Sequence, residues 1–282
     1  MQVLNLPDEI FNETIRLKNA GKSIGLVPTM GALHDGHFHL IKKARQENDL
    51  LVVSIFVNPL QFNNKEDLEN YPRTVEADLQ HLQSLGVDIA YVPSEQDMYP
   101  ELPQVSLDFG RMERVMEGEF RPGHFSGVGV VVTKLFHQCN PHRAYFGLKD
   151  LQQYLLVSRL VSDLSIPVEV IGVPIVRETS GLAMSSRNQR LSAEGRDLAV
   201  TIYQGLLLAK KLWEEKQTPD ETNRAVNAFY KEQTGLSIEY TQIVSPGNLE
   251  AKLVNDDQAT VICVAGYVEG VRLIDNLYLR QD

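Results

Sequence analysis

Two histidines three positions apart are the side chains of this sequence with the clearest chemical potential. His34 and His37 lie in the segment Pro-Thr-Met-Gly-Ala-Leu-His-Asp-Gly-His at 28–37, together with Gly31 and Gly36. Imidazole exchanges its proton near neutral pH, and glycine lets a ligand approach the backbone closely. The free N–H groups at the start of a helix predicted from His37 favour an anion. The segment therefore predicts a phosphate site in which two imidazoles face one anion.

Two simpler interpretations of this segment stay open. In the first, the histidines only cap a helix and hydrogen-bond within a turn. In the second, His34, His37 and His39 bind a metal ion, although His39 falls on another helix face and no nearby Cys or Glu completes the ligand set. The chain contains neither GxxxxGK[ST] nor GxGxxG, so the segment is neither a P-loop nor a dinucleotide-binding turn.

Three further segments place polar side chains at junctions between predicted elements. Lys149, in Gly-Leu-Lys-Asp at 147–150, can reach phosphate oxygens, and Gln153 one turn later can bond a polar substrate. The loop at 181–188 offers two hydroxyls and a guanidinium, which can grip a triphosphate. Asn58 and Gln61 are uncharged polar groups suited to the hydroxyls or carboxylate of a small substrate.

Each of these three segments also has an ordinary structural interpretation. A Lys-Asp pair at a helix start often serves only as a cap, and the Ser- and Gly-containing loop fits a polar linker between domains. Asn58 and Gln61 fit an ordinary turn. The functional interpretation of Lys149 depends on its lying at the same sheet edge as the first segment.

The elements that position these side chains alternate between strand and helix through the first half of the chain. Such alternation predicts βαβ units and a parallel sheet covered on both faces. The run 127–136 fits either a strand or a buried helix. Strands are expected at 24–27, 51–57, 88–92, 144–147 and 166–171, and helices at 37–46, 75–85 and 150–164. Because ligands of open α/β sheets bind at the carboxyl ends of strands, the first segment lies where a site is expected.

After Pro174 the pattern changes to helices followed by antiparallel strands. Two amphipathic helices are expected at 192–216 and 219–233, with Ser192 suited to the first start. Strands are expected at 238–244, 260–268 and 271–279, the last two joined by a hairpin turn at Glu269-Gly270. The sequence therefore predicts an α/β domain at residues 1–175 and a smaller α+β domain at 176–282.

Composition excludes several classes of protein. The 282 residues carry 27 Lys and Arg against 37 Asp and Glu, a formal net charge of −10, which argues against a nucleic-acid-binding protein. Cys139 and Cys263 are far apart, so a disulfide scaffold and a thiolate zinc site are excluded. Because no signal peptide and no membrane-spanning run is present, a cytoplasmic location without a membrane partner is expected.

Six ordered segments resemble the pantothenate synthetase family (pantoate–β-alanine ligases) of the HIGH-motif nucleotidyltransferase superfamily. They are Pro-Thr-Met-Gly-Ala-Leu-His-Asp-Gly-His at 28–37, Phe-Val-Asn-Pro-Leu-Gln-Phe at 56–62, Tyr-Pro-Arg-Thr at 71–74, Arg-Pro-Gly-His-Phe at 121–125, Gly-Leu-Lys-Asp at 147–150 and Met-Ser-Ser-Arg-Asn at 184–188. The resemblance covers essentially the whole chain. It implies a Rossmann-like parallel sheet at 1–175 that binds nucleotide and pantoate, and a C-terminal α+β domain at 176–282 that closes over the site.

The resemblance also implies a reaction, its substrates and its site residues. The carboxylate of (R)-pantoate attacks ATP with Mg²⁺ assistance, and β-alanine then displaces AMP from pantoyl adenylate.

Gln61 and Gln153 would bind pantoate, with Asn58 assisting and Gln61 also near β-alanine. His37 would act as an acid toward the departing phosphate, and Asp78 is implied as a Mg²⁺ neighbour. The ATP site would comprise Met30, Gly31, Ala32, Leu33, His34, Asp35, Gly36, His37, Gly147, Leu148, Lys149, Asp150, the backbone of Val176, Met184, Ser185, Ser186 and Arg187. His34, His37, Lys149, Ser185, Ser186 and Arg187 would be the catalytic set, and a homodimer is implied.

The sequence departs from the family pattern at a few positions. Leu148 stands where the family usually has Glu or Gln, and Ser180 replaces a common acidic residue. Phe38 and His39 are also unusual. None of these falls on the residues assigned to chemistry, so they bear on affinity and loop geometry.

Three other functions are compatible with parts of the sequence. Another small-molecule adenylyltransferase of the superfamily would typically be shorter and lack the Asn-Pro-Leu-Gln-Phe segment. A class I aminoacyl-tRNA synthetase would need basic surface for tRNA, which a net charge of −10 does not supply. A nucleotide sensor would bind ATP without transfer.

Overall fold

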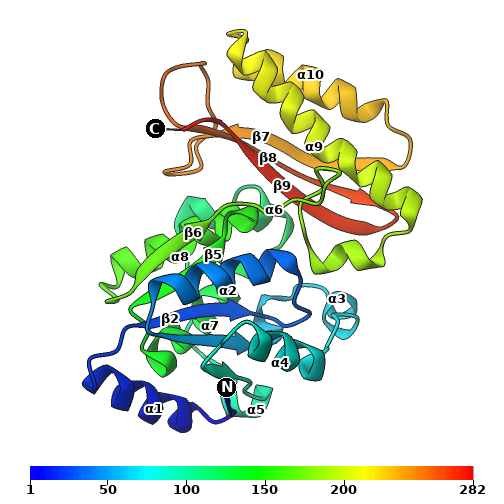
Figure 1. Cartoon of the computed structure of the whole chain (residues 1–282). Coiled ribbons are helices and arrows are strands. Elements are labelled where there is room, and N and C mark those ends of the chain that lie inside the picture. Colours follow the sequence, from blue (N-terminus) through cyan, green and yellow to red (C-terminus); the bar gives the residue numbers. More distant parts are fainter. Residues whose placement is uncertain (282) are drawn as a thin grey trace.

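A parallel sheet of six strands forms the centre of the N-terminal part of the molecule (Figure 1). The computed structural model describes residues 1–281, and the strand order is β1-β4-β3-β2-β5-β6. All five neighbouring pairs run parallel. The strands are β1 (Gln2–Leu4), β2 (Ile24–Thr29), β3 (Leu50–Ile55), β4 (Ile89–Tyr91), β5 (Arg143–Gly147) and β6 (Glu169–Val173).

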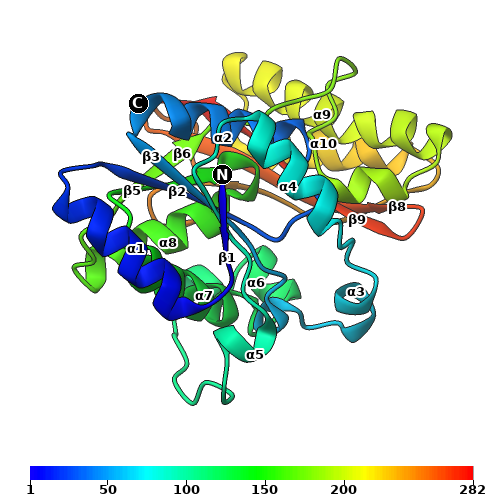
Figure 2. The same ribbon diagram turned by 60° about the horizontal axis from the view of Figure 1, so that its bottom comes forward.

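Helices cover both faces of this sheet, as the almost wholly apolar strands require (Figure 2). On one face, Leu51, Val53 and Ile55 of β3 pack with α2 and α4, whereas Val52 on the other face packs with α1, α7 and α8. The helices of this part are α1 (Pro7–Asn19), α2 (Asp35–Glu47), α3 (Lys65–Glu69), α4 (Val75–Ser84), α5 (Glu95–Met98), α6 (Glu117–Phe120), α7 (His124–Cys139) and α8 (Leu151–Asp163). Short 3₁₀ turns occur at η1 (Pro59–Gln61), η2 (Gly110–Glu113), η3 (Leu148–Asp150) and η4 (Ser186–Arg190).

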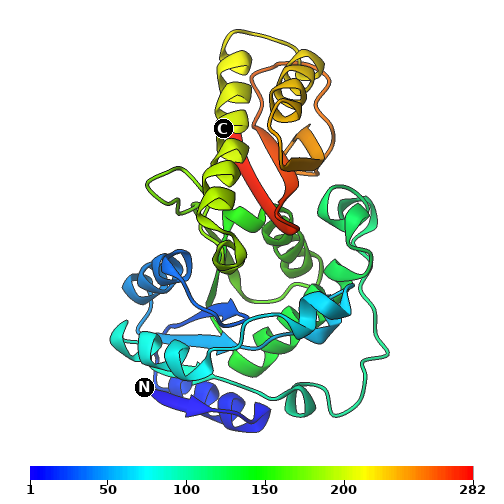
Figure 3. The same ribbon diagram turned by 90° about the vertical axis from the view of Figure 1, so that its right-hand side faces the viewer.

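A second, antiparallel sheet follows in the order β7-β8-β9 (Figure 3). Its strands are β7 (Leu236–Val244), β8 (Thr260–Val268) and β9 (Val271–Arg280). The helices α9 (Ala193–Glu214) and α10 (Pro219–Lys231) cover the face turned away from the parallel sheet (Figure 1). The other face meets the N-terminal part, where Tyr240, Val261 and Cys263 pack with Met116 and Leu151.

The structure confirms the α/β fold class and the main predicted elements. The hairpin turn has positive φ at Glu269 (51°) and Gly270 (75°), and Ser192 caps α9 through its hydroxyl. The ambiguous run at 127–136 is helical, within α7. The last parallel strand begins at Glu169 rather than 166, because Pro167 has no N–H for a sheet hydrogen bond. The domain boundary at residue 175 stays a prediction.

The order in which strands are added to the sheet changes direction at β2. From β2 the chain continues to β3 and β4 on one side of it, and then to β5 and β6 on the other side. Strand β2 pairs with β3 on one side and with β5 on the other, so the crossovers from β2 and to β5 leave on opposite sides. Open α/β sheets bind ligands at such a switch point, outside the carboxyl ends of the strands. Within residues 1–281, no helix is long and apolar enough to cross a membrane.

We predict that Gly127→Ala destabilises the fold. A Cβ there would lie 2.3 Å from the Leu60 carbonyl oxygen and 2.8 Å from the Gln61 nitrogen, so η1 and α7 would have to separate. Overpacking of this kind costs roughly 1–3 kcal/mol. Thermal denaturation should show a lower midpoint for this variant, whereas Gly247→Ala, where the nearest atom is 3.9 Å away, should match the parent chain. The same thermal midpoint for the parent chain, Gly127→Ala and Gly247→Ala would contradict the close packing of η1 against α7.

Candidate active site

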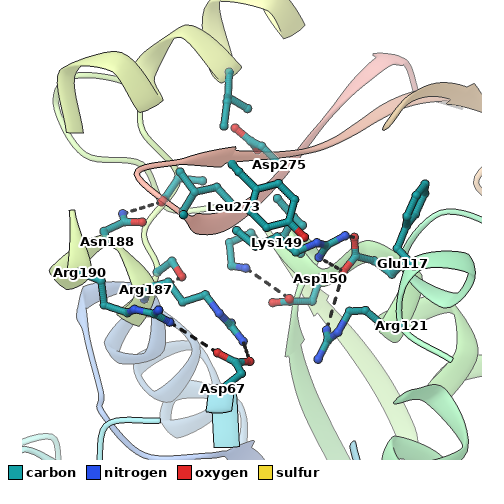
Figure 4. A pocket seen from close by; sticks show the side chains of 18 of the residues that line it. Asp67, Glu117, Arg121, Lys149, Asp150, Arg187, Asn188, Arg190, Leu273 and Asp275 are labelled. Carbon is teal, nitrogen blue, oxygen red and sulfur yellow. Dashed lines mark hydrogen bonds and ion pairs between the residues drawn. The ribbon is translucent and has the colours of Figure 1, made fainter. Parts of the chain in front are cut away.

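A cavity of about 200 Å³ opens at the carboxyl edge of the parallel sheet. It adjoins a cleft of about 360 Å³ under the C-terminal sheet, since Lys149, Asp150, Ser185 and Arg187 line both (Figure 4). Residues from all four candidate segments line the smaller cavity: Met30, His34, Gly36, His37, Asn58, Gln61, Gly147, Lys149, Asp150, Gln153, Val176, Met184, Ser185, Ser186 and Arg187.

A buried carboxylate fixes the backbone of the loop after β2. Asp78 of α4, which is 2% exposed, accepts hydrogen bonds from the N–H groups of Ala32 (2.9 Å) and Leu33 (2.8 Å). Gly31 (φ 80°) and Ala32 (φ 50°) are both left-handed, and a Cβ on Gly31 would lie 3.0 Å from Asp78 Oδ2. Because both carboxylate oxygens accept from the backbone, Asp78 supports the loop, and its place beside Mg²⁺ stays a prediction.

His34 and His37 lie side by side at the start of α2, with ring centroids 4.1 Å apart. The helix begins at Asp35, earlier than predicted, and His34 is its N-cap: Gly36 N–H donates to His34 Nδ1 (3.1 Å). Since Nδ1 accepts, the neutral ring of His34 carries its proton on Nε2. The capping interpretation is therefore correct for one nitrogen of His34 and leaves the other for a ligand.

Both imidazoles are neutral at physiological pH. Burial, and then the nearby Lys149 ammonium, lower the pKa of His34 to about 4. Burial, His34 and Lys149 lower the pKa of His37 to about 3. His39 is exposed, and no cluster of three His, Cys, Asp or Glu side chains suited to a metal occurs within residues 1–281. The paired rings thus present N–H donors to an anion.

Cationic side chains approach the same space from two other elements. Lys149 on η3 is largely buried and its ammonium lies 3.3 Å from Asp150 Oδ1. Arg187 on η4 pairs with Asp67 of α3 at 3.2 Å, and Arg190 also approaches that carboxylate, at 3.5 Å (Figure 4). The Ser185 hydroxyl accepts from Arg187 N–H at 3.2 Å and starts this turn. The cleft is therefore lined by cationic side chains that are paired with carboxylates.

Gln61 is fixed by a network of buried hydrogen bonds. Asn58 Nδ2 donates to Gln61 Oε1 (3.1 Å) and to the Gly127 carbonyl (3.1 Å), so Asn58 acts on the cavity through Gln61. His124 Nδ1 lies 2.8 Å from the Gln61 carbonyl oxygen, and its Nε2 lies 3.2 Å from Arg121 Nη1. Because arginine only donates, His124 accepts at Nε2 and donates at Nδ1 to the carbonyl.

An apolar wall completes the smaller cavity. Helix α7 contributes Val128, Val131, Val132 and Leu135, and β3 leads to Phe56 on the same side. Gln61 and Gln153 line the same cavity. The cavity therefore combines an apolar wall with two amides, two imidazoles and the cationic side chains of Lys149 and Arg187.

Several predicted site residues support the cavity without lining it. Four of them lie in or beside the loop after β2: Gly31, Ala32, Leu33 and Asp35. Leu148 packs over Gly172 and Tyr154, so this departure from the family pattern lies outside the cavity. The carbonyl of Val176 accepts from Met184 N–H at 3.0 Å, which leaves other parts of Val176 to face the cavity.

Sequence reasoning missed four contributions to the site. They are the apolar wall of α7, Asp67, the Arg121–His124 pair, and Asp275-Asn276 on β9. The last had a signal: two consecutive polar residues interrupt a strand that is otherwise largely apolar, and both are buried.

We predict that acidification from pH 7 to 5 destabilises the protein through its buried histidines. Burial lowers the pKa of His124 to about 3, as it lowers those of His34 and His37, whereas an unfolded histidine titrates near 6.5. Below that pH only the unfolded chain binds these protons, so the free energy of unfolding falls by up to about 1.4 kcal/mol per pH unit per histidine. Urea denaturation should give a shallower pH dependence for His37→Gln and an unchanged one for the exposed His39→Gln. Equal slopes for all three proteins would contradict the neutral ring of His37.

Comparison with known proteins agrees with this geometry. The family model described as pantoate-beta-alanine ligase matches residues 2–278. The pantothenate synthetase of Cytophaga hutchinsonii is 48% identical over 264 residues, covering 93% of each chain. That of Bacteroides fragilis is 44% identical over 283 residues and covers 100% of both.

Solved structures show the same fold over the full length. The crystal structure of pantothenate synthetase from Thermus thermophilus superimposes with a TM-score of 0.93 at 42% identity, covering 100% of both chains. Pantoate-beta-alanine ligase from Francisella tularensis, solved with beta-gamma ATP and beta-alanine, gives a TM-score of 0.82 at 37% identity, covering 100% of this chain and 99% of the other. The chain belongs to the pantoate-beta-alanine ligase family.

Proposed function

We propose that the protein condenses (R)-pantoate with β-alanine at the expense of ATP, releasing AMP and pyrophosphate. The proposal rests on family membership and on one observation: a single cavity is lined by an apolar wall, two amides, two imidazoles and the cationic side chains of Lys149 and Arg187. Pantoate carries a carboxylate, two hydroxyls and a dimethyl-substituted carbon. Its methyl groups fit the α7 wall, and its polar groups fit Gln61 and Gln153.

In the first step, a pantoate carboxylate oxygen attacks the α-phosphorus of ATP. The bond between the carboxylate oxygen and the α-phosphorus forms as the bond from the α-phosphorus to the bridging oxygen breaks. Pyrophosphate leaves with that oxygen and with the electron pair of the broken bond. No protein nucleophile is needed because the carboxylate is itself nucleophilic. The chain's task is to align the reactants and stabilise the developing negative charge.

His34, His37 and Lys149 are assigned to the phosphates. Neutral imidazoles donate N–H hydrogen bonds, and the Lys149 ammonium adds a full charge. Binding of a polyanion raises the pKa of a neighbouring imidazole, so His37 becomes able to protonate the departing phosphate only once ATP is present. Ser185, Ser186 and Arg187 approach from η4, where Arg187 must exchange Asp67 for phosphate oxygens.

In the second step, the neutral amine of β-alanine attacks the acyl carbon of pantoyl adenylate. The C–N bond forms, the bond from carbon to the AMP oxygen breaks, and a proton leaves the nitrogen. Gln61 is assigned to both pantoate and β-alanine, and its amide, which lines the cavity, is fixed by Asn58.

The residues present fit Mg²⁺ that enters with ATP. Magnesium usually keeps several waters and is bound through substrate phosphates and one or two carboxylates. Asp150 is the partly exposed carboxylate shared by the cavity and the cleft, so it would hold the ion. When bound, the ion would neutralise phosphate charge. A homodimer and a cytoplasmic location stay predictions.

The direct test follows products with purified protein, ATP, Mg²⁺ and pantoate. Pyrophosphate should appear without β-alanine, and AMP with pantothenate only after β-alanine is added. No finding favours another adenylyltransferase of the superfamily. A lack of β-alanine-dependent AMP release would overturn the proposed reaction, and ATP binding without turnover would indicate a nucleotide sensor.

We predict that His37→Ala and Lys149→Ala each lower the rate of pyrophosphate release by on the order of 100-fold, as expected for loss of a group acting on the phosphates. His39→Ala is the matched control, since it lies on the same helix with an exposed side chain. Stopped-flow measurement of the first turnover distinguishes adenylation from later steps. Rates close to that of the control in both variants would refute the assignment.

We predict that Gln153→Ala raises the KM for pantoate and leaves the KM for ATP within about twofold. A hydrogen bond to a charged substrate contributes about 1.5–3 kcal/mol, so the pantoate KM should rise roughly 10- to 100-fold. Steady-state kinetics with each substrate varied in turn measures the two constants. A larger change for ATP than for pantoate would place Gln153 at the nucleotide instead.

A further inference from the structure

Two polar residues lie consecutively in the middle of β9. Asp275 and Asn276 are 5% and 4% exposed, in a strand whose other buried residues are mainly apolar. Both belong to the C-terminal sheet, yet their side chains bond segments that border the ATP site of the proposed function. Neither is expected to touch a substrate.

The side chain of Asn276 spans the boundary between the two parts of the molecule. Its Nδ2 donates to the carbonyl oxygens of Leu148 (2.8 Å) and Lys149 (3.1 Å), so both amide hydrogens are used on consecutive residues of η3. These two carbonyls belong to the turn from which the Lys149 side chain extends. Two bonds to one rigid amide restrict the rotation of that turn more than either bond alone.

Asp275 fixes the opposite border of the site. Its carboxylate forms a bidentate pair with Arg177 (2.6 and 2.9 Å), and Arg177 also donates to the Asn276 carbonyl (3.3 Å). The guanidinium stacks on the Tyr203 ring at 3.9 Å. Arg177 directly follows Val176, which lines the cavity. Burial raises the pKa of Asp275, and the charges of Arg177 and Lys149 act in the opposite direction. The Lys149 ammonium is therefore close enough to interact electrostatically with the Asp275 carboxylate.

We propose that Asn276 is a positioning residue for Lys149: its amide holds the Leu148–Lys149 turn so that the ammonium faces the triphosphate. This rests on the proposed role of Lys149 at the phosphates. Without the amide, the turn loses both bonds and Lys149 samples orientations that do not reach ATP. The loss should therefore fall on ATP and spare pantoate, which the proposed function assigns to Gln61 and Gln153.

The test compares Asn276→Ala with a matched variant of the same chemistry. Asn255 also donates from Nδ2 to two carbonyls, those of Trp213 (2.8 Å) and Gln217 (3.0 Å), but both acceptors lie within the C-terminal part. Asn276→Ala should raise the KM for ATP at least tenfold with the pantoate KM within twofold. Asn255→Ala should lower the thermal midpoint and leave both KM values within twofold. Equal effects of the two variants on the ATP KM would overturn the proposal.

A double-mutant comparison tests whether Asn276 acts through Lys149. In a Lys149→Ala background, removal of Asn276 should raise the ATP KM by less than a further twofold. A full tenfold effect in that background would overturn the proposal. Asn276→Asp keeps the shape but removes the donors, so it should reproduce the alanine result if Asn276→Ala does not fold.

The remaining outcomes are also decisive. If neither Asn276 variant folds, Asn276 serves stability and the proposal is wrong. If the parent chain releases no pyrophosphate with ATP and pantoate, the proposed function fails irrespective of Asn276. If the parent chain is active and Lys149→Ala is fully active as well, the role of Lys149 fails and the proposal for Asn276 fails with it, while the proposed function stands. The two failures are therefore distinguishable.

Discussion

The common direction of β2, β3, β5 and β6 is the constraint on which the site depends. Parallel strands place all their carboxyl ends at one edge, so the segments that follow them meet there although they lie far apart along the chain. That edge receives His34 after β2, Asn58 after β3, Lys149 after β5 and Val176 after β6. Asp78 then fixes the loop after β2, in which Gly31 and Ala32 are left-handed.

The C-terminal sheet contributes to the site as well as covering it. Arg272 of β9 forms a bidentate pair with the buried Glu117 of α6 (2.7 and 2.8 Å), and Tyr240 donates to the same carboxylate (2.8 Å). Removal of one partner of a buried pair leaves an uncompensated charge, which is strongly destabilising. This contact fixes β9 against α6, and Asn276 fixes it against η3. The cationic side chains of the cleft thus come from both parts of the molecule.

Much of the architecture could be predicted from sequence, because strands buried on both faces and amphipathic helices have distinct periodicities. The carboxyl-edge positions of His34, Asn58 and Lys149 followed from that alternation alone. Whether 127–136 is a strand or a helix could not be predicted, since its valines fit a strand and its close packing, such as that of Gly127 against Leu60, depends on another element. The partners of Asp78, Asp67 and Asn276 were also beyond sequence reasoning, because each lies on another element. Asp78 shows this limit most clearly: the resemblance implied a Mg²⁺ neighbour, and it gave no sign that the carboxylate also bonds the backbone of the loop after β2.

The central claim is that one cavity brings a pantoate carboxylate to the α-phosphorus of ATP. Isotope transfer tests it most directly. Pantoate labelled with ¹⁸O in its carboxylate is incubated with the protein, ATP, Mg²⁺ and β-alanine, and the products are analysed by mass spectrometry. Attack at the α-phosphorus predicts one ¹⁸O in AMP and none in pyrophosphate, since the carbon–oxygen bond breaks when the amine adds. Unlabelled AMP, or label in an inorganic phosphate product, would contradict the claim.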